Sequence, residues 1–242
     1  MENLTPAERV AQLRLDERST RRRRNLFVAC AVAGVLALVI TIGLVIQSRR
    51  DTTGEAVPQT PQGATGDYGV VIGKKDAEHT VVVYEDFQCP VCQAFEEATS
   101  AELEKAIKAG TVSVEYRMVS FLDHASKNTY SSRAANAAVA VLDLAGPEAF
   151  AAFHAALFAD QPAEGTAGPD NEALIDQAVA AGADRSDVTP LIEGGAYDQW
   201  VGAATDAMSR AGVRGTPTVL IDGEPAGETP ADMAQAVLKL VS

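Results

Sequence analysis

The sequence of 242 residues is 47% hydrophobic, enough to bury a core in one large domain or two small ones, so disorder throughout is excluded. Residues 1–50 carry nine arginines against four acidic residues (+5), whereas residues 51–242 carry eleven basic against twenty-nine acidic residues (−18). A domain at −18 is repelled by phosphate backbones and anionic lipid headgroups, which argues against binding to nucleic acid or a membrane surface. Three cysteines are too few for a disulfide-stapled scaffold.

An uncharged stretch near the N-terminus predicts a membrane anchor. Leu26–Ile46 runs for twenty-one residues without a charge, and a helix rising about 1.5 Å per residue then spans a hydrocarbon core of about 30 Å. Seven arginines precede the stretch and two follow it. The positive-inside rule therefore predicts a basic cytoplasmic tail at 1–24, a transmembrane helix at 25–47 and an extracytoplasmic remainder. A cleaved signal peptide is the alternative, although the apolar run is longer than such peptides need.

A polar segment separates this anchor from the folded part of the chain. Residues 48–67 are rich in Pro, Gly and Thr and show no periodicity, which predicts a flexible linker. A coil of that length has an r.m.s. span on the order of 25 Å. The remaining residues, 68–242, are predicted to form one domain held away from the bilayer.

The first elements of this domain form a β-helix-β unit. Residues 80–87 are a β-branched apolar run suited to a buried strand. Residues 90–109 then have apolar side chains at helical spacing, with Pro90 at the start and Gly110 as the stop. Residues 111–119 alternate apolar and polar side chains, which predicts a second strand.

Helical patterns dominate the next part of the sequence. They cover residues 128–159, 171–181 and 197–211, and Gly146-Pro147 interrupts the first, so about four helices are expected. A short strand at 216–222 and a helix at 230–240 end the chain. Strands separated by helices, with one helical insertion at about 124–212, predict an α/β domain on a small mixed sheet.

Cys89 and Cys92 stand where the first strand gives way to the helix, with Pro90 and Val91 between them. A sulfur at a helix N-terminus faces unsatisfied N–H groups and the positive end of the helix dipole, which lowers a thiol pKa. Cys89 is therefore the predicted nucleophile, and Cys92, one turn later, the resolving thiol. A structural disulfide and half of a zinc site are the alternatives; the first closes too short a loop to stabilise much, and the second lacks two further ligands.

Two separated motifs carry a resemblance to a known family. The chain resembles the DsbA-like branch of the thioredoxin superfamily over about residues 68–242, through Asp86-Phe87-Gln88-Cys89-Pro90-Val91-Cys92 and, after the helical insertion, Gly215-Thr216-Pro217-Thr218. The resemblance implies a thioredoxin-like fold. It also implies a cis Thr216–Pro217 bond beside the cysteines, with backbone near Thr216 that pairs with an extended substrate segment.

The chain departs from that family at one position. Six residues before the first cysteine, where the family often has a buried carboxylate that assists proton transfer, this chain has Val83. Glu85 or Asp86 is a candidate replacement through water, but a solvated loop carboxylate is an equal expectation for either. His79, His124 and His154 share no spacing typical of a metal site, so these histidines, like the single tryptophan Trp200, are expected in packing or surface roles.

These patterns predict a thiol-disulfide oxidoreductase that needs no cofactor beyond its own Cys89–Cys92 pair. As an oxidase it would act on unfolded or cysteine-containing secreted proteins at the cell membrane, and the resemblance implies a membrane recycler of the DsbB or vitamin K epoxide reductase type. The alternatives are a thiol reductant, an isomerase, or a non-catalytic holdase with a structural disulfide. The helical insertion either caps the active site or merely covers the sheet.

Overall fold

A computed structural model describes residues 60–242 of the chain. The predicted basic tail, transmembrane anchor and most of the linker lie outside the described residues and stay predictions. Within the described part, the predicted linker ends earlier than expected, because Pro61 is buried, Gln62 N donates a hydrogen bond to Asp143 Oδ1 (2.6 Å) and Ala64 bridges Val70. The Pro- and Gly-rich composition of this segment does not reveal these contacts.

A five-stranded mixed sheet with the order β1-β3-β2-β4-β5 lies at the centre of the domain. Only β2 and β3 are parallel to each other; the other neighbours pair antiparallel. The strands are β1 (Val70–Ile72), β2 (His79–Glu85), β3 (Val112–Met118), β4 (Thr218–Ile221) and β5 (Glu224–Pro225). The predicted mixed sheet is confirmed, whereas β1 and β5, three and two residues long, are too short to show an alternation and were not predicted.

Helix α2 (Pro90–Ala109) has the predicted bounds, because both of its ends carry strong local signals. Pro90 occupies the first helical turn, where a missing N–H costs no hydrogen bond. Gly110 adopts φ 79°, and its N–H is directed at the carbonyls of Ala106 and Ile107. Helix α7 (Pro230–Leu240), also predicted correctly, starts with a reciprocal capping box between Thr229 and Asp232.

The helical insertion consists of four helices that follow β3 in the sequence. Gly146 (φ 84°) kinks the first of them before Pro147, as predicted. The third helix was not predicted, because its sequence is polar and contains Pro190. The Asp184 side chain caps its N-terminus by accepting a hydrogen bond from Ser186 N. The four helices are α3 (Tyr130–Ala159), α4 (Asn171–Ala180), α5 (Arg185–Glu193) and α6 (Asp198–Arg210).

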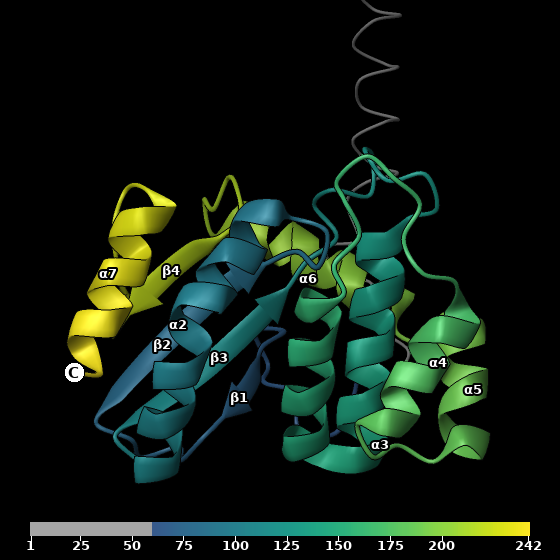
Figure 1. The fold of residues 1–242 in the computed structure, drawn as a ribbon, viewed down its shortest axis with the longest axis horizontal. Helices are drawn as coiled ribbons and strands as arrows, with labels where there is room; N and C mark the ends of the chain where they lie inside the picture. The colour runs from purple at the N-terminus through teal and green to yellow at the C-terminus, as the bar shows by residue number, and fades with distance from the viewer. Residues whose placement is uncertain (1–59) are drawn as a thin grey trace, which may run out of the picture. The chain divides into compact units, whose positions relative to one another are not determined.

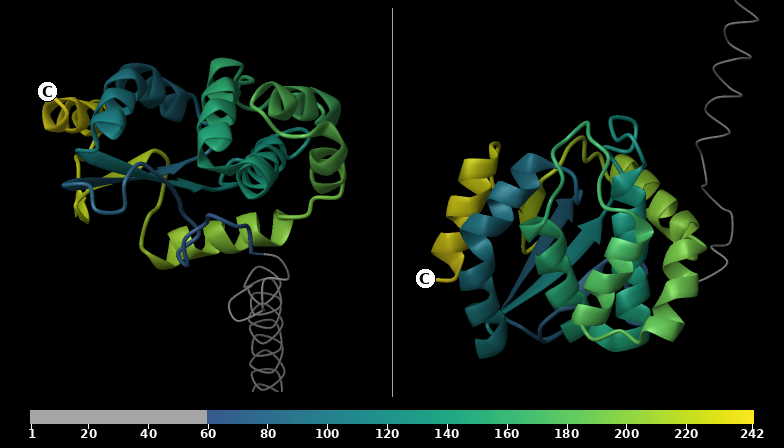
Figure 2. Two further views of the ribbon diagram at one scale, coloured as in Figure 1. Left: turned by 90° about the horizontal axis from the view of Figure 1, so that it is seen from below. Right: turned by 45° about the vertical axis from the view of Figure 1, so that its right-hand side comes forward.

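Helices cover both faces of the sheet (Figure 1). Figure 2 shows α2 and α7 on one face with α3 beside them, and α6 on the opposite face. Helix α3 is long and apolar enough to cross a membrane by length and composition, but its kink and many buried residues make it a core helix.

The alternation along β2 divides the core between these two faces. Val82 and Tyr84 pack with Met208 of α6, while Val81 and Val83 belong to the larger core under α2 and α3. Because successive strand residues point to opposite faces, Glu85 shares the face of Val83 and enters the larger core. Trp200 of α6 is buried edge-on against Tyr68, so the expected packing role is confirmed.

Candidate active site

Cys89 is the N-cap residue of α2 and Cys92 lies in its first turn. The carbonyl of Cys89 accepts hydrogen bonds from the backbone N–H groups of Cys92 (3.0 Å) and Gln93 (3.2 Å). Both cysteines are free thiols in this structure, 6% and 1% exposed respectively. The helix therefore begins at Cys89, the predicted nucleophile, and its first turn buries Cys92, the predicted resolving thiol.

The loop that contains Thr216 and Pro217, far from the cysteines in the sequence, lies beside Cys89. The Thr216–Pro217 peptide bond is cis, the geometry that the resemblance implies. Cys89 Sγ donates a hydrogen bond to the carbonyl oxygen of Thr216 (3.4 Å), although 127 positions separate the two residues. Thr218 Oγ1 donates to the carbonyl of Gly215 (2.8 Å) and braces the loop.

The pKa values of the two thiols are shifted in opposite directions. A hydrogen bond from the Cys92 side chain, together with contacts to Thr216 and the backbone N–H groups of Val91 and Cys92, lowers the pKa of Cys89 from 9.0 to about 6 despite burial. Burial, followed by the neighbouring Cys89 sulfur, raises the pKa of Cys92 far above that of an ordinary thiol. Near neutral pH the outer sulfur is a thiolate and the inner one a thiol.

Three glutamines that sequence reasoning overlooked hold the cysteine loop and the start of α2 against the end of α3 and the segment that follows it. Gln161 Nε2 donates to the carbonyl of Cys89 (3.0 Å), and Gln93 Nε2 donates to that of Phe158 (2.8 Å). Gln88 Nε2 donates to the carbonyls of Ala163 and Thr166. The helical insertion therefore borders the active site and does more than cover the sheet. Pro90 and Val91 are exposed between the cysteines, Val91 by 40%.

The expectation of solvated carboxylates at Glu85 and Asp86 is wrong, because both side chains are buried. Asp86 accepts hydrogen bonds from Gln88 N (2.8 Å), Ser131 Oγ (2.6 Å) and Leu122 N (2.8 Å). Burial raises its pKa in spite of these donors. Its hydrogen bonds fix the turn that delivers Cys89 to the start of α2.

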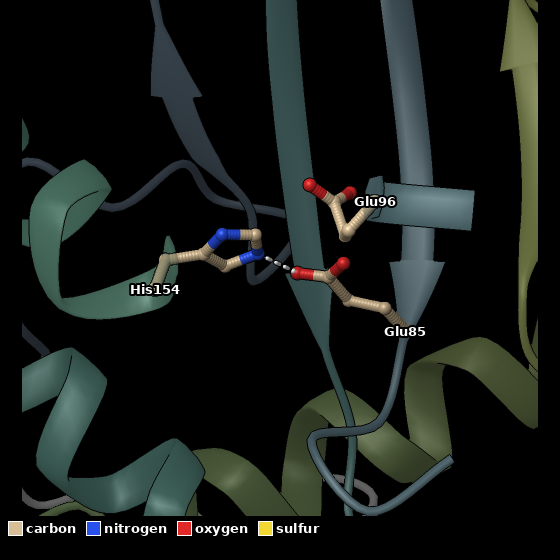
Figure 3. Close-up of side chains that lie close together, drawn as sticks. All are labelled: Glu85, Glu96 and His154. Atoms are coloured by element: carbon tan, nitrogen blue, oxygen red, sulfur yellow. Dashed lines mark hydrogen bonds and ion pairs between the residues drawn. The ribbon is translucent and has the colours of Figure 1, made fainter. Parts of the chain in front are cut away.

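A buried cluster of Glu85, Glu96 and His154 joins three elements in the same core (Figure 3). Glu85 Oε1 lies 2.5 Å from His154 Nε2, and both side chains are at most 4% exposed. Glu96 reaches the cluster from α2, so that one ligand-type atom of each residue lies within 4.8 Å of the others. His154 packs as expected, among the rings of Phe87, Tyr116, Phe150 and Phe158, but its ion pair was not foreseen.

This cluster is a poor fit to a metal ion. Two ligands bound to one Zn²⁺ at about 2.0–2.2 Å in tetrahedral geometry lie roughly 3.3 Å apart. The 2.5 Å contact of Glu85 Oε1 with His154 Nε2 is shorter and is a direct hydrogen bond. His79 and His124 bond instead to Asp222 Oδ2 and the carbonyl of Phe121 near the surface.

Comparisons with known proteins agree with this geometry. The family model described as thioredoxin matches residues 65–239. Two solved structures from Mycobacterium tuberculosis are 36% identical: a disulfide bond oxidoreductase, DsbG, with a TM-score of 0.63 over 74% of this chain and 89% of that one, and DsbA, with a TM-score of 0.61 over 72% and 92%. The thiol-disulfide oxidoreductase MdbA from Corynebacterium diphtheriae is 28% identical, with a TM-score of 0.61 over 79% and 98%.

The chain belongs to the thioredoxin family, with a helical insertion in its α/β fold. Within that family it is a DsbA-like thiol-disulfide oxidoreductase. A curated relative, the serine/threonine-protein kinase PknE of Mycobacterium tuberculosis (strain H37Rv), is 28% identical over 158 residues, which are 62% of this chain and 28% of the kinase. The chain thus matches little more than a quarter of that protein's length.

Proposed function

We propose that this oxidoreductase introduces disulfides into secreted or membrane proteins outside the cell membrane, with Cys89 exchanging with substrate and Cys92 completing the cycle. A substrate thiolate attacks Cys89 Sγ of the enzyme disulfide, and Cys92 leaves. A second substrate thiol then attacks the mixed disulfide and releases Cys89 as a thiolate. The substrate loses two electrons and the enzyme gains them.

The observation that carries this direction is the stabilised Cys89 thiolate. With a pKa of about 6 instead of 9.0, the thiolate at pH 7 favours the reduced folded protein by about 1.4 kcal/mol, equivalent to about 30 mV for a two-electron couple. Stabilising the reduced form makes the disulfide more oxidising. The carbonyl of Thr216, next to Cys89, supports backbone pairing with extended substrates of varied sequence.

The proposed location and partners rest on the N-terminal sequence. The uncharged run at Leu26–Ile46 supports a single-pass anchor that leaves the redox domain outside the membrane. Reoxidation of the dithiol then requires a membrane electron acceptor, which we propose to be a recycler of the DsbB or vitamin K epoxide reductase type.

The test is the reduction potential of the Cys89–Cys92 pair, equilibrated against glutathione buffers. A value near about −120 mV agrees with a disulfide donor, whereas one near about −270 mV indicates a reductant. A value below about −300 mV without exchange indicates a structural disulfide and would contradict the proposal.

A trapping experiment separates exchange from mere binding. In Cys92→Ser the Cys89 thiolate can still attack a substrate disulfide and release one substrate thiolate, but no inner thiol resolves the product, so mixed disulfides should accumulate on Cys89 and disappear on reduction. Cys89→Ser is the matched control and should trap nothing. Equal, reduction-resistant association of both variants with partners would support a holdase instead.

A further inference from the structure

The peptide unit that joins Cys89 to Pro90 can be held through one polar group alone. Proline has no backbone N–H, so the carbonyl of Cys89 is the only hydrogen-bonding group of this unit. That carbonyl accepts bonds from the backbone N–H groups of Cys92 (3.0 Å) and Gln93 (3.2 Å), both in α2. Gln161 Nε2, 72 positions along the chain from Cys89, is a third donor at 3.0 Å. The insertion therefore holds this peptide unit together with α2.

The orientation of this peptide unit affects where the Cys89 sulfur points. Cys89 is the N-cap residue of α2, with an extended backbone (φ −80°, ψ 113°) and no capping bond from its side chain. Rotation about ψ would turn the carbonyl relative to the Cα–Cβ bond that carries the sulfur. In the structure the sulfur lies 3.4 Å from the carbonyl oxygen of Thr216. Bonds to the Cys89 carbonyl therefore help to fix the sulfur in this place.

Gln161 donates from a fixed position. Its backbone N–H is bonded to the carbonyl of Phe158 (3.4 Å) at the end of α3. Phe158 is buried and packs on Phe87, two residues before Cys89, with ring centroids 5.2 Å apart. The same Phe158 carbonyl accepts a bond from Gln93 Nε2 (2.8 Å). The end of α3 and the start of α2 are thus joined in both directions.

The contact made by Gln161 differs from those of the other two glutamines. Gln88 and Gln93 donate to carbonyls of the insertion, at Ala163, Thr166 and Phe158. Gln161 donates to the carbonyl of the nucleophile itself. The first two bonds fasten the insertion to the cysteine loop, whereas the third acts directly on Cys89.

We propose that Gln161 is a positioning residue for Cys89, which keeps the Cys89 sulfur aligned for exchange with Cys92. When a mixed disulfide closes, Cys92 loses its proton to water and its thiolate attacks the Cys89 sulfur. A Cys89–Cys92 bond forms, the bond from Cys89 to the partner sulfur breaks, and the partner thiolate takes up a proton. This step requires the three sulfur atoms to be aligned. The proposal rests on thiol-disulfide exchange and holds for either direction of electron flow.

The test compares Gln161→Met with Gln177→Met in the full chain. Methionine has nearly the length of glutamine but no N–H donor. Gln177 of α4 donates to Asp160 Oδ2 (3.0 Å), one residue before Gln161, so its variant controls for a lost amide contact in the same segment. The reduced chain is mixed with oxidised glutathione, quenched with acid at set times and analysed by mass spectrometry. Closure of the Cys89 mixed disulfide should be about tenfold slower in Gln161→Met and unchanged in Gln177→Met.

Two further readouts distinguish positioning from a merely structural role. Alkylation of Cys89 by iodoacetamide needs no alignment with Cys92, so at a pH where the thiolate is fully formed its rate in Gln161→Met should stay within about twofold of wild type. Gln161→Lys keeps an N–H donor and should restore part of the closure rate.

Three outcomes would count against the proposal. Equal closure rates in wild type and Gln161→Met would overturn it alone, while direction is still decided by the reduction potential. A loss of alkylation rate as large as the loss of closure rate would show that Gln161 only supports the fold, and would also overturn it. A wild-type chain that forms neither a mixed nor a closed disulfide with oxidised glutathione would overturn the proposed function as well.

Discussion

Replacing Cys92 with alanine should make Cys89 a much weaker acid. The hydrogen bond from the Cys92 side chain is the largest contribution that lowers the pKa of Cys89 to about 6. A hydrogen bond to a charged group contributes about 1.5–3 kcal/mol, or roughly one to two pKa units. The Thr216 side chain and the backbone N–H groups of Val91 and residue 92, which also lower this pKa, remain in the variant. We therefore expect its Cys89 pKa at about 7 to 8, still below an ordinary thiol.

Cys92→Ser is the matched variant for this prediction, because a hydroxyl group keeps a donor at nearly the same position. Its Cys89 pKa should fall between those of the wild type and Cys92→Ala. The assay follows the rate of iodoacetamide alkylation, or the ultraviolet absorbance of the thiolate, as a function of pH in the reduced proteins. Equal pKa values in both variants, or a wild-type value above about 8, would refute the assignment of the hydrogen bond.

Three further predictions concern stability. Because the pKa of Cys89 is lower in the folded than in the unfolded protein, the unfolded state binds one more proton between about pH 6 and 9. The unfolding free energy of the reduced protein, relative to that of Cys89→Ala, should therefore rise by about 2.5 kcal/mol from pH 5.5 to 8. A difference in unfolding free energy that does not change with pH would contradict this prediction. Phe153→Ala, in the fully buried core, should cost about 3–5 kcal/mol in urea unfolding followed by Trp200 fluorescence, against less than about 1 kcal/mol for Leu144→Ala, which is 41% exposed. Thr229→Ala removes the cap of α7 and should cost about 1 kcal/mol in the same assay, and an unchanged urea midpoint would show that the cap contributes nothing.

Local signals made part of the fold predictable. Helices α2 and α7 could be predicted because each begins with a proline and has apolar side chains at helical spacing. Helix α2 also ends at a glycine, Gly110. The redox pair could be found for the same reason, since its two cysteines and the helix that activates Cys89 are neighbours in the chain. Helix α5 has Asp184 and Gly194 at its ends, but its polar sequence and internal Pro190 obscured them. The shortest strands exist only because longer strands pair with them.

The buried carboxylates could not be predicted in this way. A glutamate and an aspartate at the end of a strand resemble ordinary loop residues until their partners are known. The partner of Glu85 is 69 positions away on α3, and that of Asp86, Ser131, is 45 positions away. Such pairs arise from tertiary packing, and periodicity in one segment carries no information about them. His154 likewise had no spacing to connect it with the redox site.

The glutamine contacts around Cys89 have a consequence for how the domain tolerates its own chemistry. Gln88, Gln93 and Gln161 join the redox loop to the insertion through uncharged amides. Amide groups neither titrate nor change with the oxidation state of sulfur. These three contacts are therefore electrically neutral, and each cycle can add or remove a negative charge at Cys89 while they stay the same.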